Sequence, residues 1–375
     1  MFFMKKLFKA LLCIIAVLLI AVAVIWNGEL RTLAGIKQVG DDPYLFSCEY
    51  EARYDLDALV EAGIDENAKL VSFIIGKLSR GLYKPAPAEE TAASPFSCTS
   101  FQARNAEGEG FLFGRNYDFF KNPSLVLTSH PRDGYASIST CDLSHLGYGL
   151  DKLPVKFVSR ALCLAAIYAP MDGMNEKGFC VSVMAIPKQP ARQDTGNPIV
   201  GTSIYMRLLL DRCATVEEAL ELTSRLDIRH DQKAGAGYHF MICDAAGDAA
   251  VIEFDKNDGW KTMVVRKSPD SDWMHVTNHL LSPKYYTTEP DPAVGNPHSR
   301  SWWRYATVAE YLGSREGVIT AEEAQECLSE VHWKDLVWEN GNVEDTQWSN
   351  VYDQSALTLR LRNWNDYEKT VNFAL

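Results

Sequence analysis

Residues 98–118 read Cys98-Thr-Ser-Phe-Gln-Ala-Arg-Asn-Ala-Glu-Gly-Glu-Gly-Phe-Leu-Phe-Gly-Arg-Asn-Tyr-Asp118. Aromatic and aliphatic residues occur in the runs 98–103 and 111–117, and turn-forming residues fill positions 105–110 between them. This pattern is typical of a β-hairpin. We therefore expect two antiparallel strands joined by a turn centred near Glu107 and Gly108.

The predicted pairing brings three reactive side chains together. Cys98 lies across from the region of Tyr117, so that Arg115 and Asp118 come within side-chain reach of its sulfur. The thiolate is the reactive form of cysteine, and a nearby arginine favours it over the thiol. The hairpin is therefore predicted to carry a nucleophile.

The residues before the hairpin have the composition of a linker. Positions 85–97 read Pro-Ala-Pro-Ala-Glu-Glu-Thr-Ala-Ala-Ser-Pro-Phe-Ser, which makes Cys98 the first residue of the predicted folded domain. Cutting the Ser97–Cys98 bond would give Cys98 a free α-amine, whose ordinary pKa of about 8 suits a general base. One residue would then supply both the nucleophile and the base.

These residues resemble a known enzyme family. Cys98-Thr-Ser-Phe followed by Gly114-Arg-Asn-Tyr-Asp-Phe119 is similar to the N-terminal-nucleophile linear amide hydrolases. This family contains the choloylglycine (bile salt) hydrolases, the penicillin V acylases, and the acid ceramidase and N-acylethanolamine amidase group. The resemblance spans most of residues 98–360, and its later elements are Asp172-Gly-Met-Asn175-Glu176-Lys-Gly178, Val276-Thr-Asn278 and Arg304-Tyr305.

The alternation of hairpins with helix pairs predicts an α+β fold of two stacked antiparallel sheets with helices outside. The resemblance implies, more closely, a four-layer αββα sandwich, with no metal or organic cofactor. We propose that Asp118 orients the new α-amine and that Arg115 holds the thiolate. The family match makes Asn278 a side-chain donor to the oxyanion, and it places Glu176 beside the nucleophile with Asn175 as a pocket donor. The complete predicted catalytic set is Cys98, Arg115, Asp118, Asn278, Arg304, Glu176 and Asn175.

Ordinary structural roles compete with these assignments. Arg115 and Asp118 would also suit a cross-strand ion pair, and Asn278 would suit an Asx-turn. Asn175 and Glu176 read by default as part of a hairpin turn.

A second arginine, Arg300, lies four residues before Arg304 and is the alternative candidate for the family's late arginine. Ser299-Arg300 also resembles the family's late Ser-Arg element. We favour Arg304 because an aromatic residue follows it and a helix is predicted to start there.

A histidine pair later in the chain raises a metal alternative. His275 and His279 are spaced i, i+4, which on a helix would suit zinc. The β-branched residues between them favour a strand instead, so we predict no metal site.

Composition limits the partners. The net charge is −12 with a pI near 5.2, and no basic run lies outside the extreme N-terminus, which argues against nucleic acid. Nine cysteines lack CxxC pairs or metal spacing and predict neither a disulfide framework nor a zinc site. The oligomeric state, a homo-oligomer included, stays open.

The N-terminus is predicted to be a targeting segment. Lys5, Lys6 and Lys9 precede an uncharged apolar run from Ala10 to Trp26, which with its flanks is about long enough to span a bilayer. A cleavable signal peptide ending at Ala21-Val-Ala23 is the alternative. Either reading places the catalytic domain outside the cytoplasm, anchored to the membrane or secreted.

The domain prediction has four parts. They are a signal-anchor segment (1–26), a helical pro-segment or stalk (27–84), a linker (85–97) and an amide hydrolase domain (98–375). If the linker is cut, the acid ceramidase resemblance implies that the pro-segment stays bound.

Further elements are predicted from residue 155 onward. Strands are expected at Val155–Ile167, Gly178–Ala185, Tyr238–Cys243, Ala249–Phe254, Thr262–Arg266 and Trp273–Thr277. Helices are expected at Thr202–Cys213, Thr215–Ser224, Arg304–Leu312 and Thr320–Leu328, with Thr215 and Thr320 as N-caps.

The predicted function is hydrolysis of a linear amide in an N-acylated small molecule. The candidate substrates are conjugated bile acids, N-acyl amines, N-acyl amino acids and acyl lactones. An acyltransferase of the same fold and an inactive membrane-tethered binding protein are the alternatives, because sequence does not decide which acceptor a pocket admits.

Overall fold

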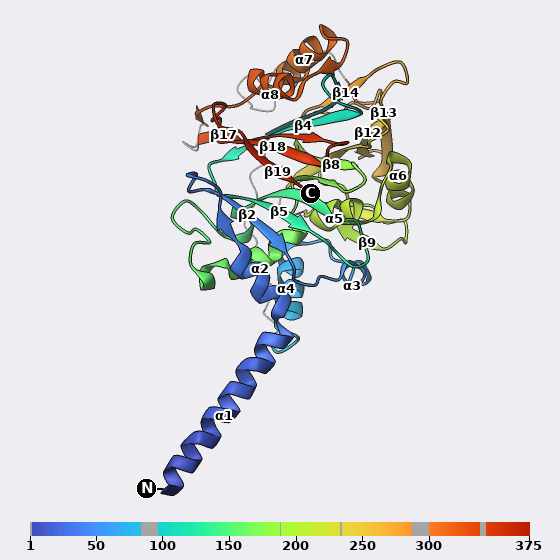
Figure 1. Cartoon of the computed structure of the whole chain (residues 1–375). Helices are drawn as coiled ribbons and strands as arrows, with labels where there is room; N and C mark the ends of the chain where they lie inside the picture. The colour runs from blue at the N-terminus through green and yellow to red at the C-terminus, as the bar shows by residue number, and fades with distance from the viewer. Residues whose placement is uncertain (1, 84–96, 188, 233–234, 287–299, 338–342) are drawn as a thin grey trace.

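Two β-sheets stacked face to face form the body of the protein (Figure 1). The structure is a computed structural model and describes residues 2–83, 97–187, 189–232, 235–286, 300–337 and 343–375. The first sheet has nine strands in the order β1 (Lys37–Gln38), β2 (Leu45–Tyr50), β5 (Ser124–Ser129), β6 (Ser137–Asp142), β7 (Asp172–Asn175), β8 (Cys180–Pro187), β11 (Ala236–Cys243), β12 (Ala249–Asp255) and β13 (Lys261–Arg266).

The second sheet has eight strands and carries the predicted hairpin. Six of its strands follow one another in the order β14 (Trp273–Val276), β3 (Ser97–Asn105), β4 (Phe111–Phe120), β17 (Val343–Asp353), β18 (Thr358–Asn363) and β19 (Val371–Ala374). The two short strands β15 (Val318–Ile319) and β16 (Leu336–Val337) pair with β3 and β17 respectively. The sheets are mixed rather than purely antiparallel, because β2 pairs parallel with β5 and β15 pairs parallel with β3. A small parallel pair is formed by β9 (Ile199–Gly201) and β10 (Asp227–Arg229).

Helices cover the outer faces of the two sheets. The helices are α1 (Phe2–Ile25), α2 (Asn27–Gly35), α3 (Leu56–Glu61), α4 (Asn67–Leu78), α5 (Thr202–Arg212), α6 (Val216–Ser224), α7 (Arg300–Gly313) and α8 (Ala321–Glu330), with 3-10 helices η1 (Leu143–Leu146) and η2 (Phe157–Tyr168). Phe101 and Leu112 of the second sheet are buried against Leu312 of α7 and Leu328 of α8, and α5 packs on β7 and β8 of the first sheet. The expected α+β sandwich with helices outside is confirmed.

The hairpin of β3 and β4 has the predicted register. Cys98 pairs with Tyr117 and Arg104 pairs with Phe111, so the turn is centred between residues 107 and 108. The Asn105 side-chain oxygen accepts a hydrogen bond from the backbone N–H of Glu107 at 3.0 Å, which is an Asx-turn.

Most of the later elements follow the pattern read from the sequence. The strands predicted within residues 178–185, 238–243, 249–254, 262–266 and 273–277 appear as β8, β11, β12, β13 and β14. Thr215 and Thr320 are N-caps, and their hydroxyls accept from the backbone N–H groups of Glu218 and Glu323. Helix α7 begins at Arg300, four residues before the predicted start at Arg304.

One strand prediction was wrong. Most of the run 155–167 lies in the 3-10 helix η2. Cys163 and Ile167 are buried while Val155 and Val158 are exposed, so the run does not have the two-residue alternation of a half-buried strand. The β-branched and aliphatic composition indicated a strand, but η2 packs on α2 and on the first sheet.

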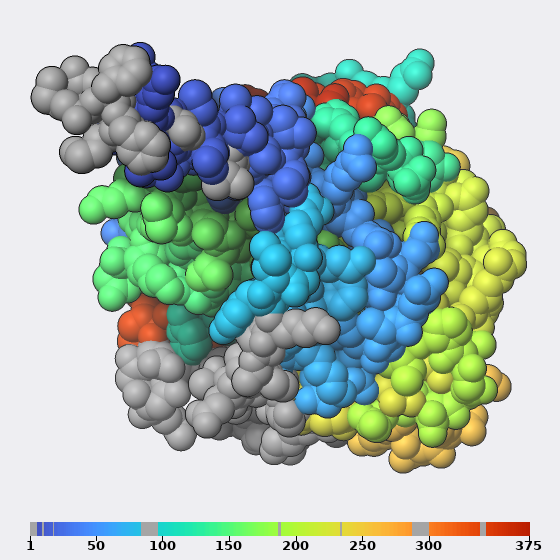
Figure 2. Space-filling view, turned by 90° about the horizontal axis from the view of Figure 1, so that it is seen from below, coloured from blue at the N-terminus to red at the C-terminus, as the bar shows by residue number. Residues whose placement is uncertain are grey.

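The segment 27–84, predicted to be a helical pro-segment or stalk, is not only helical in its described residues 27–83. It contains the helices α2, α3 and α4, but it also supplies β1 and β2 to the nine-stranded sheet. Seen from below (Figure 2), the blue surface of this segment lies directly on the green and yellow surfaces of later residues. A short strand such as β2 carries little signal in sequence, since its partner β5 is distant along the chain.

The first helix extends away from the body (Figure 1). Lys6–Ile25 is long and apolar enough to cross a membrane, and none of its described side chains is buried against the protein. A membrane anchor and a signal sequence both satisfy this description. Residues 84–96, which include nearly all of the predicted linker, lie outside the described residues.

Candidate active site

Cys98 lies on the inner face of β3, between the two sheets. Its sulfur is completely buried and donates to the backbone oxygen of Val183 in β8 at 3.6 Å. The chain is continuous through Ser97, so the Cys98 nitrogen is a peptide N–H, and it donates to Asn278 Oδ1 at 2.7 Å. The structure therefore contains an intact Ser97–Cys98 peptide bond.

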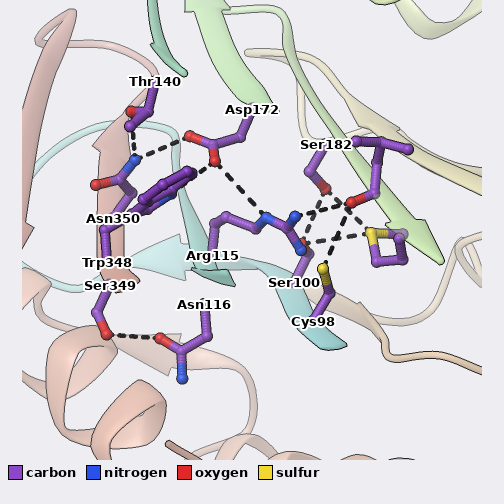
Figure 3. A network of polar contacts seen from close by, with 12 residues as sticks. Cys98, Ser100, Arg115, Asn116, Thr140, Asp172, Ser182, Trp348, Ser349 and Asn350 are labelled. Atoms are coloured by element: carbon purple, nitrogen blue, oxygen red, sulfur yellow. Dashed lines mark hydrogen bonds and ion pairs between the residues drawn. The ribbon is translucent and has the colours of Figure 1, made fainter. Parts of the chain in front are cut away.

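Arg115 reaches Cys98 from the neighbouring strand β4. Its Nη2 donates to the same Val183 oxygen at 2.8 Å (Figure 3), and its positive charge acts to lower the pKa of the Cys98 thiol. The whole Arg115 side chain is buried. Cys98 and Arg115 thus share one backbone acceptor in the space between the sheets.

A buried carboxylate, Asp172 of β7, balances Arg115. Its Oδ2 lies 3.7 Å from Arg115 Nε, and the carboxylate accepts from Trp348 Nε1 and Asn350 Nδ2, both at 2.8 Å (Figure 3). Tyr352 donates a further hydrogen bond to it. In the sequence, Asp172 lies within a motif that resembles the family, but no role is predicted for it. Its position facing Arg115, from the other sheet, emerges only in three dimensions.

Asp118 lies on β4 opposite Ser97. Thr346 Oγ1 of β17 donates to its Oδ1 at 2.5 Å. Burial raises the pKa of the Asp118 carboxyl, and the nearby Arg304, the Thr346 hydrogen bond and Arg115 oppose this shift. Asp118 is close enough to Cys98 to influence its charge.

Arg304 and Asn278 close the site on the other side of Cys98. Arg304 Nη1 donates to the Cys98 carbonyl oxygen and, at 3.0 Å, to Thr99 Oγ1. Its Nη2 donates to Asn278 Oδ1 at 2.8 Å, and Asn278 Nδ2 donates to the Ala185 oxygen at 2.8 Å. In the uncut chain the Asn278 amide, the predicted oxyanion donor, is thus already bound to a backbone carbonyl.

The charge balance does not favour the thiolate in this form. Burial raises the pKa of the Cys98 thiol to about 12; Arg115 and Arg304 act to lower it and Asp118 to raise it. The expected influence of Arg115 has the predicted direction, but the cost of taking a thiolate out of water exceeds it. Cys98 is a neutral thiol at physiological pH in the uncut chain.

Two predicted residues are not brought to Cys98. Glu176 is exposed in the turn between β7 and β8, seven residues along the chain from Val183. Asn175 is buried, but it donates to the Leu210 and Cys213 oxygens and holds the turn through its Oδ1. The structure therefore supports the turn reading for both residues.

The rival arginines occupy successive turns of α7. Arg304 points into the site, whereas Arg300 is exposed and its guanidinium lies 5.5 Å from the ring of Trp333. Arg304 is accordingly the arginine that contacts Cys98.

A family model covers the catalytic part of the chain. The model of the family described as acyl-coenzyme A:6-aminopenicillanic acid acyl-transferase matches residues 104–366. The chain belongs to this family. The resemblance read from the sequence is confirmed, and the protein is an enzyme of the N-terminal-nucleophile amide hydrolase and acyltransferase group.

Solved structures were also compared with this chain. Two mutant crystal structures of conjugated bile acid hydrolase from Clostridium perfringens match with a TM-score of 0.54 and 16% identity, over 74% of this chain and 92% of theirs, and so share its fold. Penicillin V acylase from Agrobacterium tumefaciens matches with a TM-score of 0.45 and 17% identity, over 74% of this chain and 85% of its own. A comparison with curated proteins gives no match.

Proposed function

We propose that this protein is a cysteine-nucleophile amide hydrolase that first cuts its own chain between Ser97 and Cys98. The Cys98 sulfur attacks the Ser97 carbonyl carbon, the Ser97–Cys98 peptide bond breaks, and the acyl group passes to sulfur as a thioester. The former peptide nitrogen takes the thiol proton and becomes an α-amine. Water then hydrolyses the thioester, leaving a Ser97 carboxylate and a free Cys98 thiol.

One observation carries this proposal. Arg115, Asp118, Asn278 and Arg304 are all buried, and each lies close enough to the buried Cys98 to bond to its backbone or to act on the charge of its thiol. Burying two cations and a carboxylate around a buried thiol costs desolvation free energy. Groups of buried charges of this kind are typical of sites that carry out a reaction. An ordinary cross-strand ion pair would not need this arrangement.

In turnover the cleaved residue performs the chemistry. The new α-amine accepts the thiol proton while the sulfur attacks the carbonyl of a linear amide, and the substrate amine leaves after taking that proton. Asn278 and a backbone N–H are proposed to stabilise the oxyanion, which requires the Asn278 amide to release the Ala185 carbonyl after cleavage. Water then hydrolyses the acyl-enzyme.

Intact mass and N-terminal sequencing of the full-length protein test this proposal. Wild type should yield a fragment that begins at Cys98, and Cys98→Ala should remain uncut and show no amide turnover. Amide turnover by Cys98→Ala would refute the assignment of the nucleophile. An uncut wild type without activity would refute the proposed function.

An acyltransferase is the second candidate, and the description of the matching family favours it. Transfer would pass the acyl group from Cys98 to an amine instead of water. Product analysis with and without added amine distinguishes the two: a new amide that increases with amine concentration at the expense of free acid indicates transfer.

The proposed substrates are N-acylated small molecules met outside the cytoplasm. A conjugated bile acid, an N-acyl amine and an N-acyl amino acid are the classes to compare in a release assay. Export of the catalytic domain rests on the apolar helix α1, either as an anchor or as a signal sequence.

A further inference from the structure

Thr346 faces the candidate active site because strand β17 is irregular at this point. Thr346 pairs with Asp118, and after a β-bulge Trp348 pairs with Tyr117. The extra residue is Gln347, which donates to the Phe119 oxygen at 2.9 Å and accepts from the N–H of Asn122 at 2.9 Å. A bulge re-aims side chains at the point where it occurs, and here it places the Thr346 hydroxyl on Asp118.

The hydroxyl of Thr346 has its direction fixed by a second residue. The backbone N–H of Trp333 donates to Thr346 Oγ1 at 2.8 Å, and the N–H of Thr346 donates back to the Trp333 oxygen at 2.9 Å. A hydroxyl has one proton to give. Because the Trp333 N–H uses an acceptor position on Oγ1, the proton of Thr346 is directed at Asp118 Oδ1, 2.5 Å away.

This contact leaves the other carboxylate oxygen for the reaction. Among the described residues Asp118 Oδ2 has no hydrogen-bond partner, although it is buried. The cleavage of the Ser97–Cys98 bond creates an amine on the strand directly beside Asp118. With Oδ1 held, the carboxylate cannot rotate away from this amine without breaking a short, charge-assisted hydrogen bond.

The same loop residue also supports Arg304. The Trp333 ring is completely buried, and the Arg304 guanidinium lies 5.6 Å from its centre. The backbone of Trp333 therefore holds Thr346 while its ring packs against Arg304.

We propose that Thr346, held by the Trp333 backbone, is a positioning residue that fixes Asp118 Oδ1 so that Oδ2 receives the Cys98 α-amine. The proposal rests on the proposed function for its catalytic meaning. It adds a residue from the C-terminal third of the chain that neither the family motifs nor the comparisons assign.

Two variants separate the hydrogen bond from packing. Thr346→Val keeps the shape and removes the hydroxyl, whereas Thr346→Ser keeps the hydroxyl and removes a methyl group. Per cleaved chain, Thr346→Val should lower kcat about 10- to 100-fold, the effect of losing one hydrogen bond to a charged group, with KM changed less than about twofold. Thr346→Ser should retain kcat within about threefold.

A second readout does not require activity. The parent for this experiment is the uncut full-length Cys98→Ala chain in detergent, with Thr346 intact. Its urea unfolding is compared, at about pH 4 and about pH 8, with that of the same chain carrying Thr346→Val or Thr346→Ser. The groups that face Asp118 are unchanged in all three proteins; they are Arg115, Arg304, His332 and Tyr367.

The sign of the expected pH effect follows from burial. The pKa of Asp118 is higher in the folded chain than in the unfolded chain. Its protonated carboxyl therefore stabilises the folded chain at pH values below the unfolded-state pKa of about 3.9. This stabilisation is lost as the pH rises through the folded-state pKa. Thr346→Val removes a group that lowers this pKa and should raise it further. The stability deficit of Thr346→Val should therefore be larger at about pH 8 than at about pH 4, and Thr346→Ser should show no such increase.

Each result decides between the possibilities. A deficit of Thr346→Val that is equal at both pH values, or an equal loss in Thr346→Ser, would show a packing role and overturn the inference. Wild-type kcat in Thr346→Val would do the same while leaving the proposed function intact. An inactive, uncut wild type would refute the proposed function, and the unfolding comparison would still decide whether Thr346 holds the Asp118 carboxylate.

Discussion

At the scale of single residues, the cost of burial exceeds the attraction of nearby charge around Cys98. Its thiol has a pKa of about 12 in the uncut chain although Arg115 and Arg304 are both close. The thiol is therefore neutral while the Ser97–Cys98 bond is intact, and the proposed cleavage would supply an α-amine as a base that the intact chain lacks. Under this proposal the uncut chain is a dormant form.

Asp172 gives a residue-scale prediction. It is the carboxylate that faces the buried Arg115, and it accepts hydrogen bonds from three side chains. Asp172→Asn in the uncut Cys98→Ala chain should reduce the free energy of unfolding by about 3–5 kcal/mol, because it leaves a buried guanidinium without its counter-ion. Urea unfolding measures the loss.

An exposed ion pair provides the matched control. Arg104 contacts Asp272 at 2.6 Å, and both side chains are partly exposed to water. Asp272→Asn should cost less than about 1 kcal/mol. Equal losses in the two variants would contradict the role given to burial at Asp172.

At the scale of elements, strand β2 connects the segment before the proposed cleavage site to the nine-stranded sheet. It lies between β1 and β5, in register from Leu45 opposite Ser124 to Tyr50 opposite Ser129. Side-chain contacts add to this pairing: Tyr54 donates to Asp211 at 2.8 Å, and Asp231 accepts from the Asn67 N–H at 2.9 Å. The segment is thus part of the sandwich.

This arrangement predicts that the cleaved fragments stay together. After the Ser97–Cys98 bond is cut, residues 1–97 should co-elute with residues 98–375 in size-exclusion chromatography in detergent, because separation would expose the edge of β5 and the apolar residues under β2. Denaturing electrophoresis of the eluted peak should show two bands for wild type and one for Cys98→Ala. Elution of the two fragments in different peaks would contradict the prediction.

At the scale of the whole molecule, the apolar helix and the catalytic residues belong to different fragments once the chain is cut. Helix α1 precedes the proposed cleavage site and Cys98 follows it. If α1 stays in the membrane, the packing of the segment that contains β2 holds the catalytic fragment at the surface.

Membrane fractionation tests this consequence. Wild-type membranes washed with high salt should retain both fragments, whereas urea should release residues 98–375 and leave residues 1–97 behind. Cys98→Ala should stay in the membrane under both conditions because its chain is continuous. A soluble protein whose N-terminus follows Ala23 would show instead that the first helix is a cleaved signal sequence.

Local sequence determined the hairpin and several elements around it. The spacing of turn-forming residues between two apolar runs fixes the register that pairs Cys98 with Tyr117, since each residue added to a turn shifts the pairing. The N-caps Thr215 and Thr320 are likewise local features, because the capping hydroxyl bonds to a backbone group three residues away. The hairpin pairing predicts that Cys98, Arg115 and Asp118 lie together, and the family motifs add Asn278 and Arg304. The structure contains this grouping.

Only the tertiary structure decided the rest. Whether Asn175 and Glu176 serve the site or a turn depends on how far β8 carries the chain from that turn to Val183. Asp172 of β7 pairs with Arg115, and Thr346 of β17 donates a hydrogen bond to Asp118. Residues 157–168 form a 3-10 helix because of the surfaces against which they pack. Sequence patterns reflect contacts between residues that are close along the chain. The fold brings distant segments together, and this decides which groups are desolvated, which charges pair and that β2 pairs with β5.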